Sequence, residues 1–91
     1  IDFYVKGNSR MQRLGAFDIA IYEKSGSSWS LKRTYSEFSD GMAVNNASEY
    51  SNSIFYDGTV GATYKIEVTI FARNSAGTDT RSQTFTSIVV R

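Results

Sequence analysis

The 91-residue chain contains no cysteine, no histidine and no proline. Without cysteine it forms neither a disulfide framework nor a thiolate metal site. Without histidine it lacks the commonest general base and metal ligand of proteins, so a Ser-His-Asp arrangement is excluded. These absences predict a protein that is not an enzyme and that holds no cofactor.

The chain also lacks an excess of either charge, because ten basic and nine acidic residues are interspersed and the net charge is +1. A nucleic-acid binder that neutralises several phosphates would present a basic face, and no run of Lys or Arg is present. No apolar stretch approaches the ~20 residues of a membrane-spanning helix. We therefore expect no nucleic-acid partner and no membrane span. The start at Ile1, without a signal peptide, is interpreted as a processed or trimmed end.

What the chain does contain is alternation of apolar and polar residues, interrupted by turn signals. The strands expected from it are 1–5, 16–24, 29–35, 50–56, 62–73 and 78–90. The stretch 37–48 is expected to be irregular, with D40-G41 and N45-N46 as turns and Met42 and Val44 as buried plugs. About six strands in one domain, 1–91, predict an all-β sandwich or small barrel.

Two residues favour a sandwich. Tyr64 follows a turn containing Gly61 and opens a long strand, as in a tyrosine corner, where the hydroxyl bonds to backbone a few residues upstream. Trp29 opens a strand after a hairpin and is predicted to be a large core residue, and Phe17, Ile19 and Ile21 are predicted to share one buried face.

The segment V60-G-A-T-Y-K-I-E-V-T-I-F-A-R-N-S-A-G-T78 resembles the second half of a fibronectin type III domain. More closely, L14-G-A-F-D-I-A-I-Y-E-K-S-G-S-S-W29, S39-D-G-M42 and F71-A-R-N-S-A-G-T-D-T-R81 resemble small secreted proteins of gut Gram-positive bacteria, a group of unknown function. The resemblance implies an antiparallel sandwich of the immunoglobulin or fibronectin type III kind and a secreted or cell-surface location. It implies no site residues.

In those relatives a further strand precedes the one that matches 1–5, and from the resemblance we expect the first edge strand to be missing here. We expect the edge formed by Ile1, Phe3 and Val5 to be open, with unpaired backbone donors and acceptors.

Large apolar side chains on the outer faces are the second feature to explain. On the last strands Phe71, Phe85 and Val89 are predicted to share one outer face with Tyr22, and Phe55 is predicted to point outward from the other sheet. They are either cross-strand pairs, foremost Phe71 with Phe85, or an exposed patch that contacts a partner.

Other motifs are weak. Asp18 and Glu67 are interpreted as solvated charges and not as glycosidase carboxylates, and Gly58–Gly61 as a turn and not as an RNA-binding loop. Asp40, Asn45 and Asn46 lack the spacing of a calcium loop, and Asn46-Ala47-Ser48 is a single glycosylation sequon.

The sequence thus predicts a non-catalytic structural or adhesive module that contacts copies of itself, in oligomers or filaments, or a surface protein. The alternative is a carbohydrate-binding module that presents Tyr22, Phe71 and Phe85 to a glycan. The predicted core position of Trp29 disfavours this alternative, and a surface position of Trp29 would favour it. A plain spacer is a third hypothesis.

Overall fold

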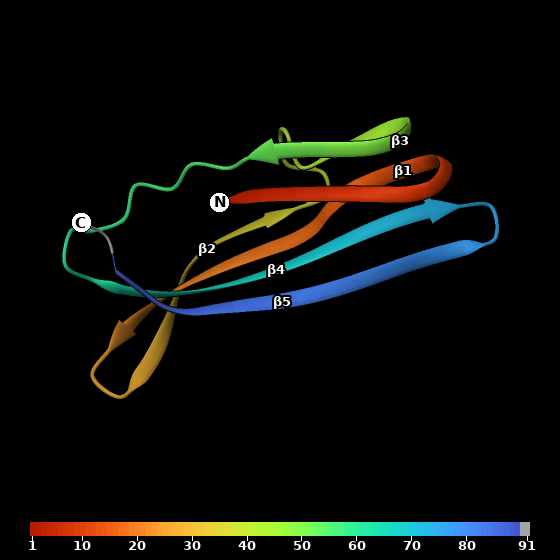
Figure 1. The fold of residues 1–91 in the computed structure, drawn as a ribbon. Helices are drawn as coiled ribbons and strands as arrows, with labels where there is room; N and C mark the ends of the chain where they lie inside the picture. The colour runs from red at the N-terminus through yellow and green to blue at the C-terminus, as the bar shows by residue number, and fades with distance from the viewer. Residues whose placement is uncertain (90–91) are drawn as a thin grey trace.

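The structure, a computed structural model, describes residues 1–89 and is built from strands alone, with no helix in that range (Figure 1). The strands are β1 (Asp2–Ser25), β2 (Ser28–Ser36), β3 (Ala43–Ser53), β4 (Thr63–Asn74) and β5 (Gly77–Val89). The prediction of an all-β fold is confirmed. The expected last strand ends at Val90, which lies outside the described residues.

All strand pairs are antiparallel and belong to one sheet with the order β2-β1-β4-β5. β1 is the central strand. On one side it pairs with β3 over Asp2–Gly15 and with β2 over Asp18–Ser25, and on the other side it pairs with β4 over Arg13–Glu23.

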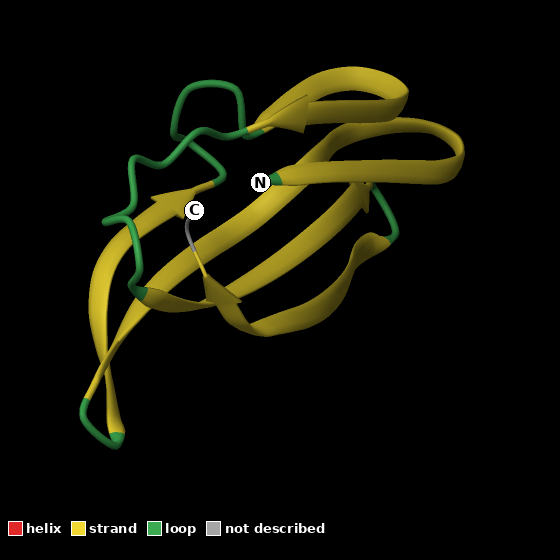
Figure 2. Cartoon of the chain, turned by 60° about the vertical axis from the view of Figure 1, so that its left-hand side comes forward, coloured by secondary structure: helices red, strands yellow, loops and turns green. Residues whose placement is uncertain are grey.

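β1 folds back on itself, so that its first limb lies over the sheet formed by its second limb (Figures 1 and 2). The register with β3 shifts at this bend, where Lys6 pairs with Glu49 and Met11 pairs with Ala47. β3 bends together with β1 and stays paired with both limbs. The two segments expected as separate strands, 1–5 and 16–24, are therefore the two limbs of one strand.

The core lies between the first limb of β1 and the inner face of the sheet. Its buried members come from both limbs and from the strands and loops around them, and they include Phe3, Val5, Met11, Leu14, Ala16, Ile19, Ile21, Met42, Ile54, Tyr64 and Val68. The alternation in 1–5 and 62–68 was thus predicted correctly, because Phe3, Val5, Tyr64 and Val68 are all buried. Met42 is buried as expected, and Val44 packs against the core from a half-buried position.

Phe17 does not share the buried face of Ile19 and Ile21, as was expected, but is 40% exposed on the outer face. The register between β1 and β4 shifts between Ala16 and Asp18, which marks a β-bulge. An extra residue at a bulge reverses the alternation of side chains. Phe17 therefore belongs to the outward set that precedes the bulge.

The irregular stretch is shorter than the expected 37–48. β3 begins at Ala43, so only residues 37–42 of that stretch lie outside a strand. Gly41 has the left-handed φ of 78° that the Asp40-Gly41 turn predicts. Asn46, in contrast, lies within β3 with a φ of 55°, a conformation that asparagine tolerates better than most residues. The predicted turn at Asn45-Asn46 is therefore wrong.

Gly15 allows the start of β3 to approach β1 closely. The N–H of Ala16 donates to the carbonyl oxygen of Met42 at 2.7 Å, and a Cβ built on Gly15 would lie 2.5 Å from the Cα of Ala43. A larger residue at position 15 would push β3 away from its contact with β1. This close approach holds the irregular stretch 37–42 against the edge of the sheet.

Candidate functional site

The first limb of β1 has one paired and one open side. Among residues 1–89, β3 is the only strand that pairs with Asp2–Lys6. Ile1 and Ile54 exchange both backbone hydrogen bonds, at 2.8 and 2.7 Å. Because hydrogen-bonded and non-hydrogen-bonded pairs alternate in an antiparallel ladder, Phe3 and Val5 also bond to β3.

The same alternation directs the N–H and C=O groups of Asp2, Tyr4 and Lys6 away from β3. We call this side of Asp2–Lys6 the open edge. The sequence predicted an open edge on this strand but assigned it to Ile1, Phe3 and Val5. Phe3 and Val5 in fact bond to β3, and Ile1 bonds to Ile54 just beyond it. The available groups belong to Asp2, Tyr4 and Lys6.

Two hollows lie beneath the open edge, between the first limb of β1 and the strands β4 and β5. The first, of about 410 Å³, is lined by Phe3, Tyr4, Val68, Ile70 and Phe85 among others. The second, of about 210 Å³, lies closer to the bend of β1 and is lined by Val5, Met11 and Ile70 together with Asp79 and Arg81. The inner face of the sheet is therefore incompletely covered on this side.

The side chains along the open edge alternate as the strand requires. Phe3 and Val5 are 7% and 4% exposed, whereas Tyr4 is 56% exposed. The Tyr4 hydroxyl donates to Oε2 of Glu49 on β3 at 2.7 Å. This hydrogen bond to a carboxylate raises the pKa of Tyr4, so Tyr4 is neutral at physiological pH and remains a donor.

Phe71, which the alternation placed in an exposed patch, is only 1% exposed. It does lie on the outer face of the sheet, where it pairs with Gly15, but two side chains cover it. Phe17 meets it edge-to-face with ring centroids 5.9 Å apart, and the guanidinium of Arg73 lies 4.9 Å from its centroid. Phe71 is thus the centre of a small outer cluster and offers no contact surface.

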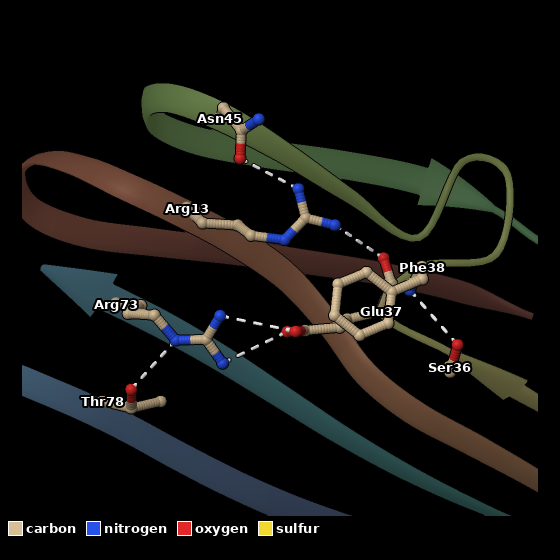
Figure 3. A network of polar contacts seen from close by, with 7 residues as sticks. All are labelled: Arg13, Ser36, Glu37, Phe38, Asn45, Arg73 and Thr78. Atoms are coloured by element: carbon tan, nitrogen blue, oxygen red, sulfur yellow. Dashed lines mark hydrogen bonds and ion pairs between the residues drawn. The ribbon is translucent and has the colours of Figure 1, made fainter.

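The polar part of this outer cluster holds the stretch 37–42 in place (Figure 3). Glu37 is 6% exposed and accepts two contacts from Arg73, at 3.3 and 3.4 Å. Arg13 donates to the carbonyl oxygen of Glu37 at 2.8 Å and to Oδ1 of Asn45 at 2.9 Å. The buried carboxylate of Glu37 is tolerated because Arg73 pairs with both of its oxygens.

Asn45 is therefore engaged by Arg13, which leaves its oxygen less suited to a calcium ion. Among the described residues, no group of three or more acidic side chains is arranged to hold a metal ion.

Phe85 is on the opposite face from Phe71, and the predicted Phe71–Phe85 pair is wrong. Phe71 pairs with Thr80, while Phe85 pairs with Ile66 on the inner face. A register shift between Tyr64 and Ile66 separates Phe85 from Ile88 and reverses the alternation of β5. Phe85 is 44% exposed and lines the larger hollow beneath the open edge.

The other predicted patch residues lie apart from one another. Phe55 is 88% exposed, but it belongs to the connection between β3 and β4 and not to a sheet. Val89 is 46% exposed and pairs with Thr63 at the end of β5. Phe55, Phe71, Phe85 and Val89 therefore form no contiguous surface.

Tyr22 lies on the outer face near Trp29, and Trp29 is not the core residue that was expected. Trp29 is half-exposed on β2, and Nζ of Lys65 lies 5.2 Å from its ring centroid and 4.6 Å from that of Tyr22. Trp29 pairs with Lys24 near the end of the β1–β2 hairpin. This hairpin extends beyond the first limb of β1 (Figure 1), so that limb does not cover Trp29.

Tyr64 is 3% exposed, and its hydroxyl accepts a hydrogen bond of 2.7 Å from the backbone N–H of Thr59. The ring packs edge-to-face against Tyr56, with centroids 5.9 Å apart. Tyr64 thereby ties the connection 54–62 to the start of β4.

Comparison with known protein families, with curated proteins and with solved structures finds no match to this chain. Since residues 1–89 contain no helix, none of them forms a helix able to cross a membrane.

The structure also reveals residues that sequence reasoning missed, foremost Glu37 and its partners Arg13 and Arg73. Arg13 and Arg73 are opposite each other in the ladder of β1 and β4. Like charges directly opposite destabilise a sheet, and here Glu37 offsets that cost, because its carboxylate pairs with Arg73 and its carbonyl oxygen accepts from Arg13. That requirement becomes visible only once the register is known, because sixty residues separate the two arginines.

We predict that Phe71→Ala lowers the free energy of unfolding by about 3 kcal/mol or more, as expected for a buried phenylalanine. Phe85→Ala, at a half-exposed position, should change it by less than about 1 kcal/mol. Urea denaturation of both variants at low protein concentration measures the difference. Similar small effects at both positions would contradict the burial of Phe71.

Proposed function

We propose that the protein is a non-catalytic structural module that assembles with copies of itself by adding a strand to the open edge of β1. The observation that carries this proposal is the row of backbone groups at Asp2, Tyr4 and Lys6, which no strand among residues 1–89 pairs. An added strand would satisfy these groups. Its inward side chains would cover the hollows beside Phe3 and Phe85, which supplies apolar burial.

We further propose that the fold is a sandwich of the immunoglobulin or fibronectin type III kind. The first limb of β1 with its part of β3 would be one layer, and the strands β2, β1, β4 and β5 the other. The hydrogen bond between Tyr64 and Thr59 supports this proposal, because a tyrosine corner ties the same kind of connection in such domains. A secreted or cell-surface location is proposed from the sequence resemblance alone.

The first test removes one backbone donor from the open edge. Tyr4→Pro deletes the N–H that points away from β3, and proline is tolerated on the edges of sheets. We expect the wild-type chain to gain mass with concentration in sedimentation equilibrium, and Tyr4→Pro to remain at 10.1 kDa. Circular dichroism verifies that the variant keeps its strands.

Tyr4→Thr is the matched control, because it removes the same ring but keeps the N–H, and it should still assemble. Asp2→Pro provides a second variant with the same defect at the first position of the strand, where proline is well tolerated. A wild-type chain that stays monomeric at millimolar concentration would sink the proposal, and so would normal assembly of both proline variants.

A second candidate function, glycan binding, is favoured by the position of Trp29. The expected platform of Tyr22, Phe71 and Phe85 is not formed, since Phe71 is buried and Phe85 lies on the inner face. Tyr22 and Trp29, however, present two half-exposed rings beside Lys65 and Glu67. Aromatic rings next to charged hydrogen-bonding groups suit a sugar, which has apolar and polar faces.

For this candidate we expect the fluorescence of Trp29, the only tryptophan, to change saturably when cellotriose or chitotriose is added. Tyr22→Ala should abolish the change, and Phe55→Ala, at a distant exposed position, should not. Fluorescence that acrylamide quenches but that neither trisaccharide alters would rule out glycan binding at this face for both sugars.

A further inference from the structure

The open edge has a pattern of side chains that is complementary to itself. Its three available backbone positions are spaced two residues apart and carry an acid, an aromatic ring and a base, at Asp2, Tyr4 and Lys6. All three side chains are exposed and alternate with the buried Phe3 and Val5. Read in the opposite direction, the series is base, aromatic, acid.

We infer that two copies of the chain join their open edges as antiparallel strands about a two-fold axis at Tyr4. This inference rests on the proposed function and names its partner and geometry. In this register Asp2 lies opposite the partner's Lys6, and Tyr4 lies opposite the partner's Tyr4. Lys6 in turn lies opposite the partner's Asp2.

The backbone favours this register. In each of the three opposed pairs, both residues direct their N–H and C=O groups toward the other chain. Each pair is therefore of the hydrogen-bonded type and exchanges two bonds. No available donor or acceptor of Asp2, Tyr4 or Lys6 is left without a partner.

The charges favour the same register over its neighbours. Opposite charges directly across two strands stabilise a sheet, whereas like charges destabilise it. An axis at Asp2 would place that acid against the partner's Asp2, and an axis at Lys6 would place two lysines together. Both shifts also pair fewer residues. Only the axis at Tyr4 aligns both charges with their complements and stacks two tyrosine rings.

The inner side of the joint is apolar. Phe3 lies opposite the partner's Val5, so the buried row of the first limb continues from one chain into the next. The hollows beside Phe85 and Ile70 then face the second chain instead of solvent.

Because the same edge is used on both chains, the pairing closes on itself. A two-fold dimer consumes the open edge of each copy, which also removes a site at which further strands could add. We therefore expect a dimer of twice the 10.1 kDa chain mass, and no filament.

The inference is tested with two charge reversals that are matched to each other. Asp2→Lys alone and Lys6→Asp alone each place two like-charged pairs in the joint, and each should raise the dimer Kd about tenfold or more. An equimolar mixture of the two variants restores opposite charges at both positions. We expect the mixture to form heterodimers with a Kd within about threefold of the wild type. Sedimentation equilibrium at low salt measures all three, since screening weakens exposed pairs.

One control separates the joint from a contact within the chain. The Ser53 hydroxyl donates to the Asp2 carboxylate, so Ser53→Ala removes that bond without changing the charges of the joint, and its dimer should be unaffected. Full dimerisation of either reversal alone, or no recovery on mixing, would overturn the two-fold register.

The outcomes also distinguish this inference from the proposal on which it rests. If Tyr4→Pro prevents assembly but the reversals have no effect, the open edge accepts a strand in another register, and only the inference fails. If the chains form assemblies larger than a dimer and these require the N–H of Tyr4, the two-fold dimer is contradicted, but strand addition at the open edge is not. If neither Tyr4→Pro nor Asp2→Pro has an effect, both fail together.

Discussion

The fold-back of β1 is the constraint on which the rest of the structure depends. A single strand supplies Phe3 and Val5 from one limb and Leu14 and Ile19 from the other, and all four are buried in the same core. The first limb is held over the sheet by β3, which bends together with it. Among residues 1–89 this limb pairs with a strand on that side alone. The same arrangement that completes the core therefore also creates the open edge.

The outer face of the sheet is stabilised separately. Arg13 and Arg73 lie opposite each other in the ladder of β1 and β4, and both contact Glu37. Arg73 pairs with its buried carboxylate, and Arg13 donates to its carbonyl oxygen. This cluster covers Phe71 and fixes the short stretch that leads into β3. Since β3 holds the first limb of β1, the polar contacts on the outer face contribute to the position of the open edge on the inner side.

The sequence predicted the strands and their buried faces well where alternation is uninterrupted, as in 1–5 and 62–68. It failed where a bulge reverses the alternation, which turned Phe17 outward and Phe85 inward. Trp29 was placed in a core that does not extend to the end of the β1–β2 hairpin. The sequence predicted an open edge on the first limb of β1. It could not predict that Asp2, Tyr4 and Lys6 are the available residues, because that depends on which alternate residues hydrogen-bond to the neighbouring strand β3.

Amide hydrogen exchange of Asp2–Lys6, followed residue by residue with NMR, tests the open edge most directly. In dilute protein the account predicts slow exchange at Phe3 and Val5, whose N–H groups bond to β3, and fast exchange at Tyr4 and Lys6. As concentration rises and chains pair, Tyr4 and Lys6 should become protected as well. Protection of Tyr4 and Lys6 in the dilute monomer would contradict the account, because it would mean that the chain covers this edge itself.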